Sequence, residues 1–271
     1  MSNSPHPAPD QSADPLIRFE AVSKSFQSRS GTVLAVENVD LVVKRGEIVT
    51  LVGPSGCGKS TLLNMVAGLF APSSGQVLYE GRPVTELNRK VGYMTQGDHL
   101  LPWRTVVGNV MAPLEIMGVP QGEAQDRVKE LLALVGLNGF EKSYPSQISG
   151  GMRKRTALAR LLAYDPETLL MDEPFGALDA LLRLRMQVEL RALYRRLGKA
   201  VLFVTHDLEE AVALGDRCAV FSARPGRILE VVDIPLPQER DLMQLRYDAS
   251  FAQTSARLWA LLTPELDGMG R

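Results

Sequence analysis

The sequence predicts an α/β fold with a mostly parallel sheet, an N-terminal antiparallel β-subdomain and an inserted helical subdomain. Three short apolar runs, Ile48–Val52, Leu169–Met171 and Val201–Val204, are each followed by a segment with helical spacing. Apolar strands joined by helices are typical of a parallel sheet covered on both faces. Each run ends in polar residues, and ligands bind outside the carboxyl ends of the strands in such sheets. We therefore expect these three ends to form one site.

The first strands are predicted to be antiparallel. Leu16–Val22 and Val33–Val43 alternate apolar and polar residues, as strands with one solvated face do. Before them, residues 1–14 are rich in proline and polar residues and lack an apolar run, which predicts a disordered tail rather than a signal peptide. After them we expect a strand over Glu47–Val52, a helix over Ser60–Gly68, and strands over Gly75–Glu80 and Lys90–Met94.

The middle of the chain, about residues 105–164, is predicted to be a helical subdomain. Gln125–Val135 places apolar residues on one helical face, and Met152–Tyr164 has the same spacing. The α/β pattern then resumes with a strand over Thr168–Met171, a helix over Leu181–Leu197, a strand over Ala200–Thr205, a helix over Leu208–Leu214 and a strand over Cys218–Ser222. Residues 235–271 are expected to form a C-terminal extension that is helical around Asp248–Leu262.

Composition excludes several classes of protein. A net charge of −1 over 271 residues argues against a nucleic-acid-binding protein, so no nucleic-acid partner is expected. No apolar run approaches the length of about 18 residues that a membrane span needs. The two cysteines, Cys57 and Cys218, are interpreted as reduced thiols, since their spacing matches no metal site.

The strongest motif lies between the first buried strand and the helix that follows it. The peptide from Gly53 to Ser60 fits G-x-x-x-x-G-K-[ST], which predicts a P-loop NTPase core. Glycines allow successive backbone N–H groups to face one concavity, and the helix N-terminus adds its positive dipole end. We expect Lys59 to reach the β- and γ-phosphates of ATP and Ser60 to hold Mg²⁺. The predicted nucleotide contacts of this loop are Gly53, Pro54, Ser55, Gly56, Cys57, Gly58, Lys59, Ser60 and Thr61.

The other two strand ends supply acid–base groups. Adjacent residues of a strand point to opposite sides, so Asp172 and Glu173 can do different work. We expect Asp172 to bind Mg²⁺ through water and Glu173 to orient or deprotonate the attacking water. His206, at the third strand end, is interpreted as a γ-phosphate contact, the alternative being a structural histidine.

One predicted helix begins against the usual charge preference. Ser149, Gly150 and Gly151 open it, and the three cations Arg153–Arg155 follow in its first turn. Cations there oppose the helix dipole, and such local conflicts often mark functional sites. An anion docked at the serine and the glycine amides would resolve the conflict; the alternative is a solvated basic face.

Taken with the P-loop, these segments resemble those of ATP-binding cassette (ABC) proteins. Ile148–Met152 resembles the family's signature sequence, and Gly176–Asp179 resembles its D-loop, in which Asp179 would contact nucleotide. Phe26 is similar to the aromatic residue that stacks on adenine. Gln96 resembles the Q-loop glutamine, a metal ligand and catalytic group, and His206 the switch histidine. The resemblance covers about residues 16–230, so we expect an ABC ATPase domain over residues 15–234.

Narrower features resemble importer ATPases of the nitrate/sulfonate/taurine type. These are Leu100–Arg104 after the Q-loop, Met152 in the signature, and Ala223–Arg227. The chain departs from the family pattern at four places: Ile148 replaces the usual Leu, Met152 and Lys154 stand where Gln is common, and Gly97–His99 replaces the usual residues after Gln96. None of these departures removes a catalytic group.

The resemblance implies a mechanism and partners. Two chains would form a head-to-tail, ATP-dependent homodimer in which each P-loop faces the partner's Ser149–Gly151, and hydrolysis would reopen it. The chain would lie peripherally on the cytoplasmic face of the inner (plasma) membrane. There it would contact transmembrane permease subunits, with Trp103 in the docking surface or, alternatively, covering the helical subdomain. A periplasmic or extracellular solute-binding protein would act indirectly.

Three other functions stay open at this stage. The first is a soluble ABC ATPase that acts on nucleic acid or the ribosome; the chain lacks the long insertions and the second cassette of such proteins. The second is a non-hydrolysing ATP sensor, which Glu173 and His206 disfavour. The third is the ATP subunit of a different ABC transporter class.

Overall fold

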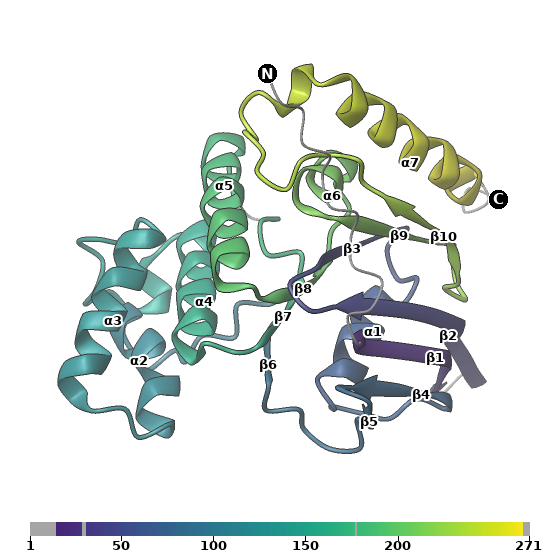
Figure 1. Ribbon diagram of the computed structural model, residues 1–271. Helices are drawn as coiled ribbons and strands as arrows, with labels where there is room; N and C mark the ends of the chain where they lie inside the picture. Colours follow the sequence, from purple (N-terminus) through teal and green to yellow (C-terminus); the bar gives the residue numbers. More distant parts are fainter. Residues whose placement is uncertain (1–14, 29–30, 177, 268–271) are drawn as a thin grey trace.

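The computed structural model describes residues 15–28, 31–176 and 178–267, and for residues 266–267 the backbone only. The predicted N-terminal tail, residues 1–14, lies outside the described residues. Two sheets form the centre of the molecule, and helices lie beside them (Figure 1). The predicted α/β class is confirmed.

The first sheet is antiparallel and has the strand order β2-β1-β4-β5. Its strands are β1 (Pro15–Ser28), β2 (Gly31–Lys44), β4 (Ser74–Tyr79) and β5 (Arg82–Pro83). The strand predicted to stop at Val22 continues to Ser28 because an irregularity between Phe19 and Val22 keeps it paired to β2. Ala21 adopts a φ of 46° there. A local bulge of this kind lets one strand change direction without losing its partner.

The second sheet has the order β10-β9-β3-β8-β7-β6. Its strands are β3 (Ile48–Val52), β6 (Val91–Met94), β7 (Thr168–Asp172), β8 (Ala200–Val204), β9 (Arg217–Phe221) and β10 (Ile228–Asp233). All its pairs are parallel except the pair of β9 with β10. Strand β10 was not predicted, because its mostly half-buried or exposed residues lack the continuous apolar character of the central strands.

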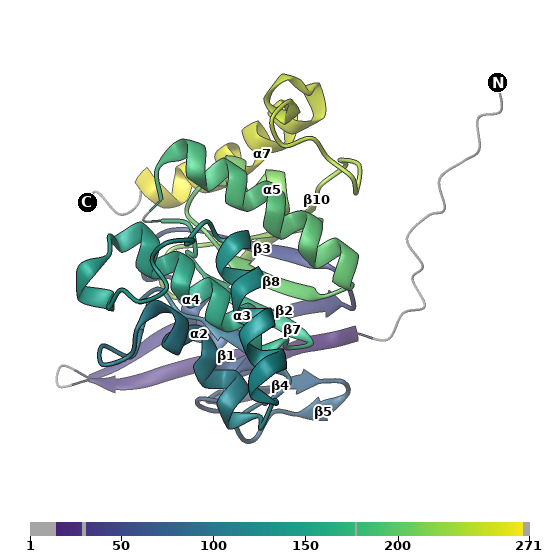
Figure 2. The same ribbon diagram turned by 90° about the vertical axis from the view of Figure 1, so that its left-hand side faces the viewer.

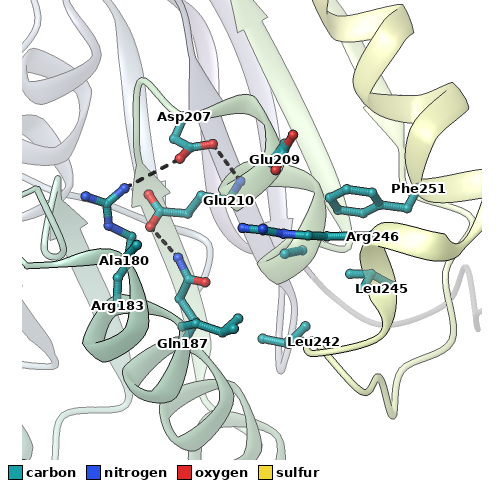
Figure 3. Close-up of a pocket in the computed structure, with 12 residues that line it drawn as sticks. Ala180, Arg183, Gln187, Asp207, Glu209, Glu210, Leu242, Leu245, Arg246 and Phe251 are labelled. Carbon is teal, nitrogen blue, oxygen red and sulfur yellow. Dashed lines mark hydrogen bonds and ion pairs between the residues drawn. The ribbon is translucent and has the colours of Figure 1, made fainter.

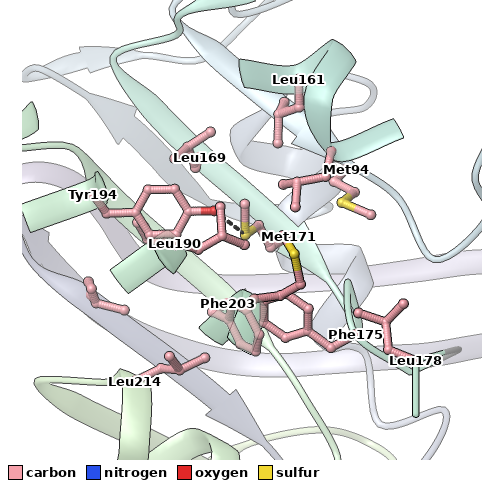
Figure 4. Packing of buried hydrophobic residues seen from close by; sticks show 14 of the residues in the cluster. Met94, Leu161, Leu169, Met171, Phe175, Leu178, Leu190, Tyr194, Phe203 and Leu214 are labelled. Atoms are coloured by element: carbon pink, nitrogen blue, oxygen red, sulfur yellow. Dashed lines mark hydrogen bonds between the residues drawn. The ribbon is translucent and has the colours of Figure 1, made fainter. Parts of the chain in front are cut away.

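Residues of the central strands alternate between two cores. Val201 and Phe203 of β8 face a core shared with the helices on one side, whereas Leu202 and Val204 face α1 (Lys59–Val66) and the antiparallel sheet. In the first core, the Tyr194 hydroxyl lies 3.4 Å from the Met171 sulfur (Figure 4). All residues of β3, β7 and β8 are buried, which explains their apolar sequences and fixes where the strands end.

The inserted helices α2 (Val106–Ile116), α3 (Gln121–Leu134) and α4 (Gly150–Tyr164) pack together at one side of the sheet (Figure 1). Thr105 and Ser149 cap the first and the last of them. Beside α4 lies α5 (Ala180–Leu197), which follows β7. A short helix, α6 (Leu208–Leu214), follows β8.

After β10 the chain crosses α6 and ends in α7 (Ala249–Asp267), on the far side from the inserted helices (Figures 1 and 2). Leu242, Phe251 and Leu258 are buried in the same core as α5 and α6. Glu265 accepts a hydrogen bond from the Ala223 amide, so the last helix also holds the loop after β9. None of the helices in the described ranges is long and apolar enough to cross a membrane.

Candidate nucleotide-binding site

The loop between β3 and α1 has the curved backbone that its glycines permit. Gly53, Gly56 and Gly58 adopt φ angles of 154°, 76° and 102°, which side chains disfavour. A Cβ at Gly58 would lie 2.3 Å from a Val36 methyl group and 2.9 Å from the Ala35 carbonyl, so only glycine fits there. The loop therefore forms a backbone cradle at the N-terminus of α1, where anions are favoured.

Lys59 lies inside the curve of this loop. Its side chain is buried, and its amine donates hydrogen bonds to the carbonyls of Gly53 (2.7 Å) and Pro54 (2.9 Å). The same amine lies 3.4 Å from the Cys57 sulfur. Cys57 and Cys218 are both buried and unpaired in disulfides, in agreement with their interpretation as thiols.

A cavity of about 850 Å³ opens where the loop meets the ends of β6, β7 and β8. Segments far apart in the chain therefore meet at one place, as the parallel sheet predicts. The cavity is lined by Phe26, Val33, Ala35, Ser55, Gly56, Gly58, Lys59, Ser60, Thr61, Gln96, Asp172, Glu173, Val204 and Arg224.

Glu173 lies between Gln96 and His206, two of the other three predicted catalytic groups. The Gln96 amide nitrogen donates to one Glu173 oxygen at 3.3 Å, and His206 Nδ1 lies 3.5 Å from the other. The side chains of Asp172 and Glu173 point apart, but not because of alternation along a strand. The strand ends at Asp172, and Glu173 has a left-handed φ of 49°, so the turn and not strand alternation separates the two side chains.

Asp172 and Ser60 form the part of the site suited to a hard cation. Asp172 is buried, and burial raises the pKa of its carboxyl, whereas the nearby Ser60 hydroxyl lowers it. Hydroxyl and carboxylate oxygens are the ligands that Mg²⁺ prefers. Gln96 lines the same cavity and offers an amide oxygen, so the predicted donor set fits Mg²⁺.

Phe26 presents its ring at the outer end of the cavity. It is 39% exposed and lies edge-to-face against Phe70, with the ring centroids 5.4 Å apart. The Lys24 amine lies 5.4 Å from the centre of the Phe26 ring and 4.8 Å from that of Phe70. A partly exposed aromatic face of this kind is a suitable platform for a nucleobase.

Sequence reasoning missed Arg224 as a lining residue. Its guanidinium donates two hydrogen bonds to the Gly56 carbonyl, at 3.2 and 3.1 Å. Gly226 packs so tightly that an added Cβ would lie 1.9 Å from the Cys57 carbonyl. The segment Ala223–Arg227, noted above only as a subgroup feature, therefore holds the outside of the phosphate-binding loop.

Eight predicted site residues are not among those that line this cavity within one chain: Gly53, Pro54, Cys57, His206, Ser149, Gly150, Gly151 and Asp179. Ser149 accepts from the Met152 amide at 3.2 Å and caps α4, next to Gly150 and Gly151. Asp179 accepts from the Leu182 amide at 3.0 Å and caps α5. Ala177, which belongs to the predicted D-loop Gly176–Asp179, lies outside the described residues.

The cations at the start of α4 have acceptors within the chain. Arg153 pairs with Asp98 at 3.0 Å, Lys154 donates to the Gln96 carbonyl, and Arg155 donates to Val135 and Gly136 carbonyls at 2.9 and 2.8 Å. Each of the three cations is therefore held by an acceptor of its own chain. Two of them connect α4 to the segment that begins at Gln96.

A buried polar network supports the strand end that carries His206. Glu210 of α6 accepts hydrogen bonds from Thr205 and, at 2.7 Å, from Gln187 of α5 (Figure 3). Asp207 caps α6 and pairs with Arg183 at 3.7 Å. Burial raises the pKa of the Glu210 carboxyl above its ordinary value. The network fixes the residues on both sides of His206.

Comparisons with known proteins agree with this geometry. A family model described as ABC transporter matches residues 36–176. An uncharacterized ABC transporter ATP-binding protein of Methanocaldococcus jannaschii is 46% identical over 231 residues, which is 85% of this chain and 86% of the relative. This chain belongs to the ABC transporter family.

Other relatives of this ABC protein carry more specific names. The aliphatic sulfonates import ATP-binding protein SsuB of Bacillus cereus is 43% identical over 224 residues, covering 83% of this chain and 88% of the relative. Among solved structures, a dimeric ATP-binding cassette in a post-hydrolysis state bound to ADP and Pi has a TM-score of 0.75 and 31% identity. It covers 82% of this chain and is itself covered completely.

Proposed function

We propose that this ABC protein hydrolyses ATP as a homodimer and thereby energises a membrane importer of small solutes. The observation that carries the proposal is the meeting of the P-loop, Gln96 and Glu173 around one cavity, with His206 in contact with Glu173. A phosphate-binding cradle beside a carboxylate held by two polar side chains is the arrangement that hydrolysis of a phosphoanhydride needs.

Each group has a definite task in this proposal. Glu173 orients the attacking water and accepts its proton, while Gln96 and His206 hold the Glu173 carboxylate on both sides. The P-loop amides and Lys59 stabilise negative charge on the phosphates, and Phe26 supports the adenine. Ser60, Asp172 and Gln96 would hold Mg²⁺, which supplies charge neutralisation at the β- and γ-phosphates.

A second copy of the chain would complete the site. The capped start of α4, with Ser149 and two glycines, does not line the cavity of its own chain. The N–H groups at a helix start suit an anion such as a γ-phosphate. A head-to-tail homodimer would bring the α4 start of each chain to the other's P-loop, and a structural relative that is dimeric and bound to ADP and Pi supports the formation of a dimer.

The segment after Gln96 offers a surface for a membrane partner. Buried Asn109 fixes the loop by bonding the Leu101 amide at 2.7 Å and the Arg104 carbonyl at 3.0 Å. Trp103 is 72% exposed and Ile116 88% exposed, so the tryptophan does not cover the helical subdomain. Beside them a groove of about 870 Å³ runs between β6, α2 and α4. Exposed apolar side chains on a fixed loop and at the end of α2 suit a helix of a permease.

The solute is proposed from the relatives together with the subgroup features. SsuB relatives are named for aliphatic sulfonate import, and Leu100–Arg104 and Ala223–Arg227 fit importers of sulfonate, nitrate or taurine. The chain would then sit peripherally at the cytoplasmic face of the inner membrane. A solute-binding protein on the other side would select the solute indirectly.

Affinity purification from native membranes tests the transport role. Glu173→Gln with ATP should trap the closed dimer, so a multi-span membrane protein should copurify in equal amount. Lys59→Ala is the matched control, because it should fail to close and should retain less of the partner. Recovery of soluble proteins or nucleic acid alone would overturn the transport role and leave the ATPase proposal standing.

A further inference from the structure

A second cavity, separate from the nucleotide cavity, is lined by arginines. It has a volume of about 1030 Å³ and lies between α5 and the segment that follows β10. Arg191, Arg195 and Arg196 come from the last turns of α5, and Arg240 from the facing segment. Residues four apart lie on one side of a helix, so Arg191 and Arg195 share a face. The two cavities have no lining residue in common.

Arg191 is the unusual member of this cluster. It is only 4% exposed, and none of its three guanidinium nitrogens has a hydrogen-bond partner among the described residues. Arg240, whose side chain is equally buried, donates to the Pro237 carbonyl at 2.7 Å and to the Val212 carbonyl at 2.9 Å. A buried cation without a partner is costly, so natural proteins rarely keep one.

Around Arg191, positively charged side chains outnumber acidic ones. Asp216 accepts a hydrogen bond from Arg195 and lies 3.9 Å from Arg240, so it is shared by two cations. The remaining acid at this cavity, Glu239, is exposed at its rim, as is Arg196. Burial and the neighbouring arginines lower the pKa of Arg191 to about 10 and that of Arg240 to about 9. Both therefore stay protonated at neutral pH.

We propose that this cavity binds a small tetrahedral oxyanion, namely phosphate, sulfate or the head group of an organic sulfonate, with Arg191 as its main contact. The flat, forked guanidinium suits such oxygens because it can donate two parallel hydrogen bonds. The bound anion bridges α5 and the segment that contains Arg240. It thereby stabilises the packing of the C-terminal extension on the core, independently of the proposed ATPase activity.

Thermal unfolding of the full-length chain tests the site. Lys59→Ala serves as the background, because the P-loop itself binds phosphate. Sodium phosphate, sodium sulfate and sodium ethanesulfonate are each compared with sodium chloride at equal ionic strength. An anion that binds only the folded state raises the melting temperature with its concentration. Calorimetric titration of the same anions gives the dissociation constants and shows which head group is preferred.

Arg191→Met in that background keeps the apolar part of the side chain and removes no hydrogen bond of the described structure. Its affinity for the preferred anion should fall about tenfold or more, the usual effect of losing a charged hydrogen bond. Arg185→Met is the matched control, since Arg185 is exposed on the same helix and does not line the cavity. General salt stabilisation is the same in both variants.

Two results would overturn the proposal. One is an equal response to the oxyanions in Arg191→Met and in Arg185→Met. The other is no oxyanion response beyond that of chloride in the Lys59→Ala background. If Arg191→Met does not fold, Arg196→Met at the rim decides instead: several-fold weaker binding supports the site, and unchanged binding contradicts it.

Discussion

The direction of the Glu173 side chain depends on the backbone conformation of this one residue. Its backbone turns out of β7 with a positive φ, and this turn aims the carboxylate at the cavity between Gln96 and His206. A carboxylate in that position can hold a water next to the phosphate cradle. The carboxylate one position earlier, that of Asp172, stays in the strand and lies near Ser60 instead.

Glu173→Gln should abolish most ATP hydrolysis and preserve ATP binding. The amide keeps the size of the side chain and one acceptor oxygen but cannot accept the water proton, and loss of such a base typically costs about 10²–10⁴-fold in rate. Phosphate release and nucleotide affinity are the measurements. Glu130→Gln, at an exposed position of α3, is the control. A variant that keeps its hydrolysis rate would remove Glu173 from the proposed mechanism.

Cys57 should be the thiol that reports on the phosphate-binding loop. Burial raises the pKa of the Cys218 thiol to about 12, so it should stay unreactive near neutral pH. Cys57 is also buried, and its modification by a maleimide should be slow, should be blocked by ATP, and should prevent ATP binding. Mass spectrometry identifies the labelled residue, with Cys57→Ser as the control. Labelled protein that still binds ATP would contradict the assigned loop.

At the scale of elements, helix ends carry the site and its supports. Ser149, Asp179 and Asp207 each cap a helix, so the start of each helix is fixed by a local hydrogen bond. The start of α4 also holds the Gln96 segment through Lys154 and through the Arg153–Asp98 pair. A movement of the inserted helices would therefore be passed to Gln96, which contacts Glu173.

The burial of Glu210 predicts that the stability of the folded chain changes with pH, in a direction set by the surroundings of this carboxyl. Burial raises the pKa of this carboxyl in the folded chain above the ordinary value of 4.5, so the folded state favours the protonated form. The wild type should gain stability relative to Glu210→Gln as the pH falls from above the folded pKa towards 4.5. Urea unfolding of both proteins across this range measures it. A pH-independent difference between them would contradict the assigned environment.

At the scale of the whole molecule, one sheet joins the nucleotide cavity to two regions for which roles are proposed above. The strand ends carry the nucleotide cavity, the inserted helices carry the exposed Trp103 loop, and the C-terminal extension closes the arginine cavity against α5. All three regions share the core around Met171 and Phe203, so a change at one can reach the others through packed side chains (Figure 4).

Trp103→Ala should uncouple transport from ATP hydrolysis. The side chain is exposed and does not line the nucleotide cavity, so ATP affinity should stay unchanged while solute uptake falls. Uptake by cells or vesicles that contain the permease is the measurement, alongside nucleotide binding. Trp259→Ala, an exposed tryptophan on α7, is the control. An equal loss of nucleotide affinity would refute the docking surface.

Part of the architecture could be predicted from short stretches of sequence. The buried strands and the P-loop were predictable because continuous apolar runs and a fixed glycine spacing act over a few residues. The strand β10, the continuation of β1 to Ser28 and the contact of Arg224 with Gly56 were not, because each depends on a partner distant in the chain. For the same reason, the sequence showed three cations at the start of α4 but not the groups that accept their hydrogen bonds.

The fold class, the family and the residues available for chemistry could all be predicted from the amino-acid sequence alone. The tertiary structure decided how they meet: it set Glu173 between Gln96 and His206, left the α4 start outside its own chain's cavity, and buried Arg191 without a hydrogen-bond partner among the described residues. The difference lies in the distance along the chain over which each interaction acts. Backbone propensities and motifs act between neighbours in the chain, whereas burial, charge balance and cavities are properties of residues that only folding brings together.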